Sequence, residues 1–312
     1  MKKHAPSLDF DVEGARRSLV SLQAAIPADA FTAPILGERR GGSGVVIGES
    51  GLVLTIGYLI TEAEEIWLTD WRGRVTQATT LAIDQATGFG LVQPLGDLGL
   101  PRLPFGASAN ARVDDDVVMI SGGEGGIVKA EIVARREFAG PWEYLLEEAI
   151  FIAPAHPFWG GAGLLSHRGE LIGVGSLHLE QDGESDAPSD LNMVVPIDLL
   201  KDSLDGLVRT GRPPGPARPW LGVYCAEHHG RIIVAGAVDG GPGESAGLRR
   251  GDVIDAIADV PVRESAALYR KLWSLGPAGV DAPLSVERDG KILKIGVKTA
   301  DRAQLLKKPR LQ

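Results

Sequence analysis

Short apolar runs follow one another from residue 44 to residue 177, and each is bounded by glycine, proline, aspartate or serine. The segments between them carry no helical periodicity. Many short, evenly spaced strands without helices between them are typical of a β-barrel or a β-sandwich. The expected strands are Gly44–Ile47, Leu52–Thr55, Glu65–Thr69, Thr80–Ile83, Phe89–Leu95, Val117–Ser121, Ile127–Val133, Leu145–Ile152 and Leu171–Leu177.

Helices are expected at both edges of this β-rich region. Apolar residues recur at roughly helical spacing between Phe10 and Ile26, which predicts a docking helix. The series of strands ends at Pro196, and the leucines after it predict another helix with proline near its first turn.

A second unit follows a proline-rich stretch, TGRPPGPARP, whose composition is that of a semi-rigid, extended linker. Beyond it, five short strands and one helix, Glu264–Leu275, predict a small α+β module. The expected organisation is an N-terminal helical segment (1–40), a β domain (41–209), a linker (210–219), the α+β module (220–300) and a solvated basic tail (301–312).

Composition excludes several classes of partner and site. The chain has 312 residues and a net charge of −9, which argues against a nucleic-acid partner or an anionic membrane. A single cysteine, Cys225, excludes an internal disulfide and a cysteine-rich zinc site, and we expect it to be a structural thiol. No apolar run follows Lys2 and Lys3, and the long uncharged stretch Ala149–His167 is interrupted by prolines and glycines. A soluble, cytoplasmic protein is therefore expected.

Several motifs together resemble HtrA/DegP-type serine proteases. The motifs that match the trypsin-like domain of this family are GSGVVIGESGLVLT (Gly42–Thr55), DQATGFGLV (Asp84–Val92), HPFWGGAGLLSHRGELIGVGS (His156–Ser176) and LNMVVPID (Leu191–Asp198). Those that match its PDZ domain are RPWLGV (Arg218–Val223), GPGESAGLRRGDVIDAIADVPV (Gly241–Val262) and ERDGK (Glu287–Lys291). The resemblance implies a mainly β fold, a trypsin-like double β-barrel followed by an α+β PDZ domain.

The same resemblance places residues without the required chemistry at all three catalytic positions. The catalytic histidine position is Tyr58 in TIGYLI, and the aspartate position is Gly88 in DQATG. The position of the serine nucleophile is Gly160 in FWGGAG. The resemblance therefore implies a degenerate triad and a pseudoprotease.

Catalytic chemistry supports this interpretation. A serine hydroxyl needs an adjacent base, and a third group must orient that base. Trypsin-like chains supply them in the order His, Asp, Ser, yet only His4 precedes the second barrel, in the expected N-terminal tail. Tyrosine is a poor base at neutral pH.

Other catalytic arrangements remain open. Ser166 or Ser176 could act with His156, His167 or His178 in a rearranged hydrolase, although SHRGE is more typical of an exposed hairpin turn. The G-x-S-x-G pattern at residues 243–247 lacks a following histidine and is interpreted as a PDZ turn and short helix.

No metal site or cofactor is expected. The histidine spacing fits neither one helix face nor one strand, and the glycine-rich loop at residues 122–126 lacks a Walker lysine. Trp159 is equally consistent with a plug in the former substrate cleft and with ordinary packing.

The PDZ resemblance carries the functional prediction. Trp220, Leu221, Gly222 and Val223 match its carboxylate-binding loop, and Leu268 and Leu272 would flank its groove. The expected partners are peptide C-termini or unfolded protein segments, and by family resemblance the chain would form a homo-oligomer, a trimer. Three alternatives stay open: a PDZ domain that only packs, a weak or rearranged hydrolase, and an inactive subunit that regulates an active relative.

Overall fold

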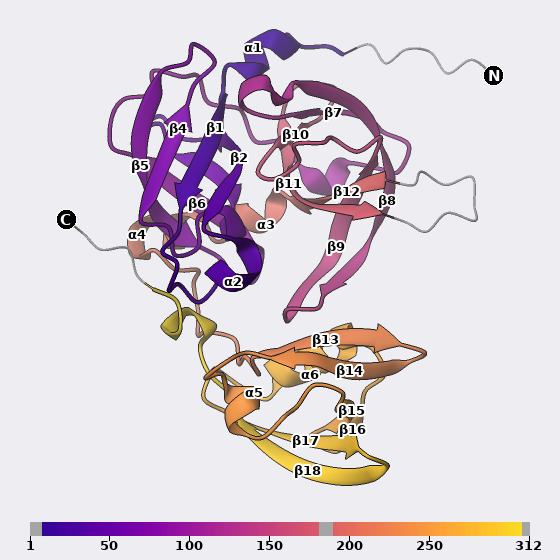
Figure 1. The fold of residues 1–312 in the computed structure, drawn as a ribbon. Helices are drawn as coiled ribbons and strands as arrows, with labels where there is room; N and C mark the ends of the chain where they lie inside the picture. Colours follow the sequence, from indigo (N-terminus) through magenta and orange to yellow (C-terminus); the bar gives the residue numbers. More distant parts are fainter. Residues whose placement is uncertain (1–7, 181–189, 308–312) are drawn as a thin grey trace. The chain divides into compact units, whose positions relative to one another are not determined.

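The computed structural model describes residues 8–180 and 190–307, which separate into two compact units (Figure 1). The barrel unit consists of the described residues of 8–136, 148–214 and Lys307. The sheet unit consists of residues 137–147 and 215–306. Each unit is described by itself below.

The barrel unit begins with a closed six-stranded antiparallel barrel in the order β1-β2-β3-β6-β5-β4. Closure leaves no unpaired strand edge in this sheet. Alternate side chains of its strands fill the interior, among them Leu22, Leu54, Leu68 and Leu91, all fully buried. The strands are β1 (Leu19–Ala25), β2 (Arg39–Val46), β3 (Val53–Ile56), β4 (Glu65–Thr69), β5 (Val75–Ile83) and β6 (Phe89–Pro94).

A second closed barrel follows in the order β10-β11-β12-β9-β8-β7. Its core contains Met119, Ile150, Leu164 and Val194, which are fully buried. The strands are β7 (Asp116–Ile120), β8 (Ile127–Gly140), β9 (Tyr144–Ala153), β10 (Gly163–Leu165), β11 (Leu171–Glu180) and β12 (Asp190–Pro196). Two short helices, α3 (Asp198–Lys201) and α4 (Leu204–Thr210), follow the last strand where one helix was expected.

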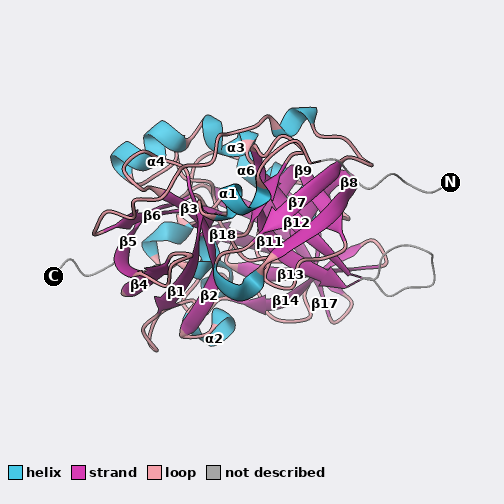
Figure 2. Ribbon diagram, turned by 90° about the horizontal axis from the view of Figure 1, so that it is seen from above, coloured by secondary structure: helices cyan, strands magenta, loops and turns pink. Residues whose placement is uncertain are grey.

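The sheet unit holds the order β13-β14-β15-β17-β18, with β16 (Val260–Pro261) paired to β15. Its core includes Leu268, Tyr269 and Leu272 of α6 (Ser265–Ser274), together with Cys225, whose predicted burial is confirmed. The other elements are β13 (Val223–His228), β14 (Arg231–Ala237), α5 (Pro242–Ser245), β15 (Val253–Ile257), β17 (Asp281–Arg288) and β18 (Lys291–Lys298). Figure 2 shows that strands dominate and that the helices are short. Among the described residues, no helix combines the length and apolarity needed to span a membrane.

The predicted helix between Phe10 and Ile26 is wrong for most of its length. Only Val12–Arg16 forms a helix, α1, and Leu19–Ala25 is strand β1, paired with both β2 and β4. Leu22, Ala24 and Ile26 are buried at a spacing of two, so the same residues satisfy a strand pattern. Pairing on both edges favours the strand, and the first barrel therefore begins well before residue 41.

The expected solvated tail is also wrong for its described part. Trp220 and Ala300 form an antiparallel bridge, and the Arg302 guanidinium lies 5.9 Å from the centre of the Trp220 ring. A short 3-10 helix, η4, covers Arg302–Gln304. In the barrel unit, the Lys307 N–H donates to Glu62 Oε1 at 2.9 Å. Residues 308–312 lie outside the described part of the chain.

The two barrels lie in close backbone contact where Gly161 meets Ser43. Gly161 has a φ of +76°, and a Cβ on it would lie 2.0 Å from the Ser43 carbonyl oxygen. A Cβ on the neighbouring Gly160 would contact only side-chain atoms, the nearest being Tyr58 Oη at 2.9 Å. Gly161 is therefore required by backbone packing, whereas Gly160 is not.

This difference gives a stability prediction. Gly161→Ala should lower the free energy of unfolding by about 3 kcal/mol, because the new methyl group overlaps backbone and the residue keeps a left-handed φ. Gly160→Ala should cost about 1 kcal/mol or less, since a tyrosine tip can shift. Urea denaturation of both variants measures the difference, and equal losses would contradict it.

Candidate functional site

The three positions predicted to hold a degenerate triad come together in the barrel unit. Tyr58 lies in the 3-10 turn η1 (Gly57–Leu59), which follows β3. Gly88 precedes β6, and its carbonyl accepts a 2.7 Å hydrogen bond from the N–H of Gly57. The Tyr58 hydroxyl lies 2.9 Å from where a Gly160 Cβ would be. The barrels thus bring Tyr58 beside Gly160, and Gly88 is hydrogen-bonded to the residue that precedes Tyr58.

Tyr58 is tied into this place by hydrogen bonds. Its hydroxyl donates to the Ser176 carbonyl at 3.1 Å and accepts a hydrogen bond from the Trp159 side chain. Burial raises the pKa of Tyr58 to about 12, and the Trp159 hydrogen bond opposes that shift only in part. The phenol is therefore neutral at physiological pH and acts as a fixed donor rather than as a base.

Gly88 occupies a turn that is unfavourable for a side chain. Its φ of +84° lies in the left-handed region, where residues other than glycine are strained. The neighbouring carboxylate of Asp84 is buried and accepts hydrogen bonds from the Ala86 N–H and the Thr87 hydroxyl, both at 2.9 Å. The Asp84 carboxylate therefore has hydrogen-bond donors for both of its oxygens within its own turn.

His156 is a buried structural histidine. Its Nδ1 accepts from the Phe158 N–H at 2.9 Å, which leaves Nε2 to donate to the Gly126 carbonyl at 3.3 Å. Burial lowers its pKa, so the ring is neutral. In trypsin-like enzymes, the oxyanion hole uses the N–H groups of the nucleophile and of the residue two positions earlier. Phe158 lies two positions before Gly160, and its N–H is already hydrogen-bonded to His156 Nδ1.

The rearranged Ser–His pair finds no support in the geometry. Ser166 sits in the expected hairpin turn, where its carbonyl accepts from the Gly169 N–H and its hydroxyl from the Arg168 N–H. Ser176 is buried, and its carbonyl is the acceptor for Tyr58. Within residues 8–180 and 190–307, no hydrogen bond joins either serine to a histidine. His167 is exposed.

Trp159 packs on the second barrel, as one of its two expected roles requires, and its role as a plug in a substrate cleft stays a prediction. Its side chain is half-buried, packs against the core of the second barrel, and lies beside the His178 ring with centroids 5.2 Å apart. It also donates to the Tyr58 hydroxyl, next to Gly160. Trp159 therefore packs on the barrel and also holds Tyr58 in place.

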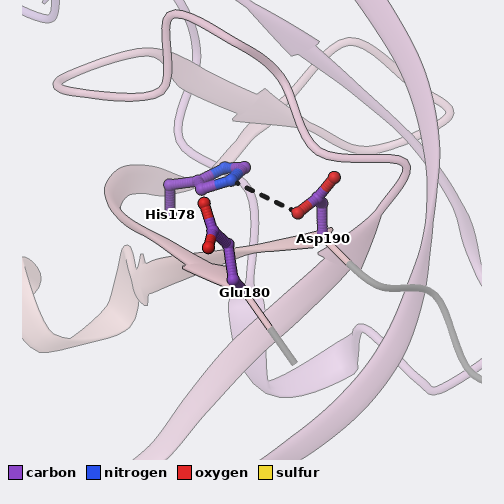
Figure 3. A group of neighbouring side chains, drawn as sticks. All are labelled: His178, Glu180 and Asp190. Carbon is purple, nitrogen blue, oxygen red and sulfur yellow. Dashed lines mark ion pairs between the residues drawn. The ribbon is translucent and has the colours of Figure 1, made fainter. Parts of the chain in front are cut away.

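A group of three potential metal ligands lies at the ends of β11 and β12. His178, Glu180 and Asp190 point toward one another, with ligand atoms within 4.8 Å (Figure 3). Glu180 and Asp190 are direct cross-strand partners, and His178 Nε2 lies 3.6 Å from Asp190 Oδ1. The group could offer a divalent cation three ligands. Sequence spacing missed it because β11–β12 pairing creates it, and the expectation of no metal stays a prediction.

The predicted carboxylate-binding loop already binds a carboxylate of this chain. Within the sheet unit, Glu143 Oε2 accepts from the Leu221 N–H at 2.8 Å, and Oε1 accepts from those of Gly222 and Val223 at 2.7 and 3.2 Å. Burial raises the pKa of Glu143 to about 7. The three N–H donors and the nearby Arg302 charge lower this pKa but do not cancel the effect of burial. No sequence motif marked Glu143, which lies in the β8–β9 turn.

The other predicted binding residues are buried rather than open to a ligand. Trp220, Leu221 and Val223 are nine-tenths or more buried, and the leucines at 268 and 272 lie on α6 in the core of the sheet unit. Leu221, Val223, Leu268 and Leu272 belong to one buried cluster, and their role in binding a peptide stays a prediction. Gly243, in the motif at 243–247, lies on α5 and donates its N–H to the Leu221 carbonyl at 2.7 Å, which supports the same loop.

Comparisons with known proteins agree with this geometry. Residues 42–174 match the trypsin-like peptidase domain, and residues 219–299 match the PDZ domain. The chain is 28% identical over 297 residues to a putative serine protease HhoA of Synechocystis, covering 84% of this chain and 72% of the relative. It is 25% identical over 278 residues to the serine endoprotease DegS of Escherichia coli K12, covering 83% and 76%.

The fold is likewise similar to solved structures. The HtrA-type protease AlgW with decapeptide has a TM-score of 0.57 and 21% identity, covering 96% of this chain and 98% of that one. The predicted fold, a trypsin-like double barrel followed by a PDZ domain, is confirmed.

The raised pKa of Tyr58 predicts a pH-dependent stability. An unfolded tyrosine ionises near pH 10, whereas folded Tyr58 keeps its proton to about pH 12. Stability is thus present below pH 10 and is lost as the pH rises toward 12. Relative to Tyr58→Phe, the wild type should lose about 1–2 kcal/mol of unfolding free energy across this interval. Denaturation at pH 9, 10 and 11 tests this, and a constant difference would contradict it.

Proposed function

We propose that this homologue of HtrA-type serine proteases, which joins a trypsin-like domain to a PDZ domain, is a non-catalytic protein that binds peptides as a scaffold or regulator. The observation that carries the proposal is the Tyr58 hydroxyl beside Gly160, at the place where a triad would need a histidine and a serine. A neutral phenol next to a glycine provides neither base nor nucleophile.

Two further features support the proposed loss of proteolysis, a backbone turn and a hydrogen bond. Gly88 keeps a left-handed turn that disfavours an aspartate, so the group that would orient a base is absent from this position. The Phe158 N–H donates to His156, which removes one donor from the oxyanion hole. A histidine and a serine restored at positions 58 and 160 would still lack these two elements.

Peptide recognition is assigned to the PDZ domain. Its loop at residues 221–223 presents three backbone N–H groups to one carboxylate, the arrangement that captures a C-terminal carboxylate. The partners proposed are peptide C-termini or unfolded segments bearing one. Assembly into homo-oligomers, or with an active relative as an inactive subunit, and a cytoplasmic location are parts of this proposal that rest on family resemblance and on the sequence.

Proteolysis of reduced casein tests the main claim. The wild type should release no acid-soluble peptides above a buffer blank, and neither should the Ser166→Ala/Ser176→Ala double variant. Cleavage by the wild type that this double variant lacks would identify a rearranged hydrolase. Cleavage by both would overturn the proposal while assigning the activity elsewhere.

Rebuilding the triad in steps tests the role of Tyr58. Gly160→Ser should show no labelling by a fluorophosphonate probe above wild type, because no base lies beside the new hydroxyl. Gly160→Ser/Tyr58→His should label about 100-fold faster, the low end of the ~10²- to 10⁴-fold that a positioned general base contributes, because no group orients the new histidine. Rapid labelling of Gly160→Ser alone would show that another base serves this position.

A further inference from the structure

Part of the β8–β9 hairpin belongs to the sheet unit rather than to the barrel from which it extends. Residues 137–147, the end of β8, the turn and the start of β9, cluster with residues 215–306. Leu145 from this segment is buried in the core of the sheet unit, and Ala139 packs against that core. The PDZ domain is thus completed by a segment that lies far upstream in the chain.

The Glu143 carboxylate takes the place of a peptide's terminal carboxylate. Both oxygens are satisfied by the N–H groups of Leu221, Gly222 and Val223, and the residue is only 9% exposed. Glu143 has a φ of +60°, an uncommon conformation for glutamate that aims this side chain from the tight turn. A loop whose three donors share one carboxylate has none of them left for a second.

The backbone of the hairpin also takes the place of a peptide strand. β13 is an edge of its sheet, and its Cys225 N–H donates to the Pro141 carbonyl at 2.9 Å. Glu143 contacts residues 221–223, whereas Pro141, two residues earlier in the hairpin, contacts Cys225, which comes later in β13. The hairpin therefore runs antiparallel to β13, as in β-strand addition by peptide ligands.

Helix α6 fastens the segment from the other side of the groove. The Tyr269 hydroxyl donates to the Gly140 carbonyl at 2.9 Å, and this contact is buried. On the surface, Arg270 pairs with the carboxylates of both Glu137 and Glu147. The hairpin is thus held by the loop, by the strand edge and by the helix, the three elements that form a PDZ groove.

We propose that residues 137–147 are an internal ligand that closes the PDZ groove, and that an external peptide binds by displacing Glu143 with its own terminal carboxylate. This inference rests on the proposed peptide-binding function. About 370 Å³ of the groove stays open beside the hairpin, bordered by the exposed residues Glu137, Glu227 and Glu264. Glu137 is already paired with Arg270, so the carboxylates of Glu227 and Glu264 are those that favour a partner with basic residues upstream of its C-terminus.

The first test asks whether Glu143 occupies the loop, without any peptide. Amide hydrogen exchange of the full-length protein is compared for wild type, Glu143→Gln and Glu143→Gly; glycine suits the positive φ and keeps the turn foldable. Exchange in residues 221–225 should rise at least 10-fold in Glu143→Gly and less in Glu143→Gln. Glu148→Gln, an exposed glutamate of the same hairpin that pairs with Arg135, is the matched control and should match wild type.

The second test measures the competition with labelled hexapeptides that end in valine, with either a free or an amidated C-terminus and with lysine or glutamate upstream. By fluorescence anisotropy, Glu143→Gly should bind the free-carboxylate lysine peptide at least 10-fold more tightly than wild type or Glu148→Gln. The loop donors are then free, and one of the three attachments that hold the hairpin in the groove is gone. The amidated peptide should show no such gain, and the glutamate peptide should bind more weakly.

The two tests separate the inference from the function on which it rests. Unchanged exchange at residues 221–225 in both Glu143 variants would overturn the internal ligand, whatever the peptides do. Faster exchange without binding of any peptide would leave the internal ligand standing and overturn the proposed peptide-binding function. Equal peptide affinity for wild type and Glu143→Gly, with exchange raised, would overturn the competition.

Discussion

Ser43 joins the two barrels, and the geometry around Tyr58 and Gly160 depends on it. Its N–H donates to the Gly160 carbonyl at 2.8 Å, its carbonyl accepts from the Thr55 hydroxyl at 2.7 Å, and its hydroxyl accepts from the Gly122 N–H at 2.9 Å. One residue of the first barrel thus fixes two loops of the second. Because these hydrogen bonds hold the scaffold, the proposed loss of catalysis would follow from the side chains present and not from collapse of the scaffold.

The side chains of Tyr58, Trp159 and His156 surround Gly160 and its neighbouring backbone. Tyr58 and Trp159 hydrogen-bond to each other beside Gly160, and His156 takes up a backbone donor nearby. Each satisfies polar groups that a substrate or a transition state would otherwise use. In the proposed non-catalytic protein, such contacts would add stability at a place that an active enzyme keeps open for its substrate.

The fold could be predicted from the sequence because two kinds of signal agreed. Short apolar runs bounded by glycine and proline predicted a barrel or a sandwich, and the order of the motifs, through family resemblance, implied two barrels and a PDZ domain. The errors have a common cause. Leu22, Ala24 and Ile26 fit a strand as well as a helix, and only pairing with β2 and β4 decides between them. Glu143 and the His178 group depend on residues brought together by tertiary structure, which no spacing along the chain displays.

Residues 137–147 begin and end in strands β8 and β9 of the second barrel, yet they pack in the core of the sheet unit. If this hairpin closes the groove as proposed, a ligand that favours its docked conformation weakens the binding of a peptide. By reciprocity, a bound peptide then weakens the binding of that ligand by the same factor. Peptide binding at the groove would in this way be coupled to the second barrel through one continuous stretch of chain.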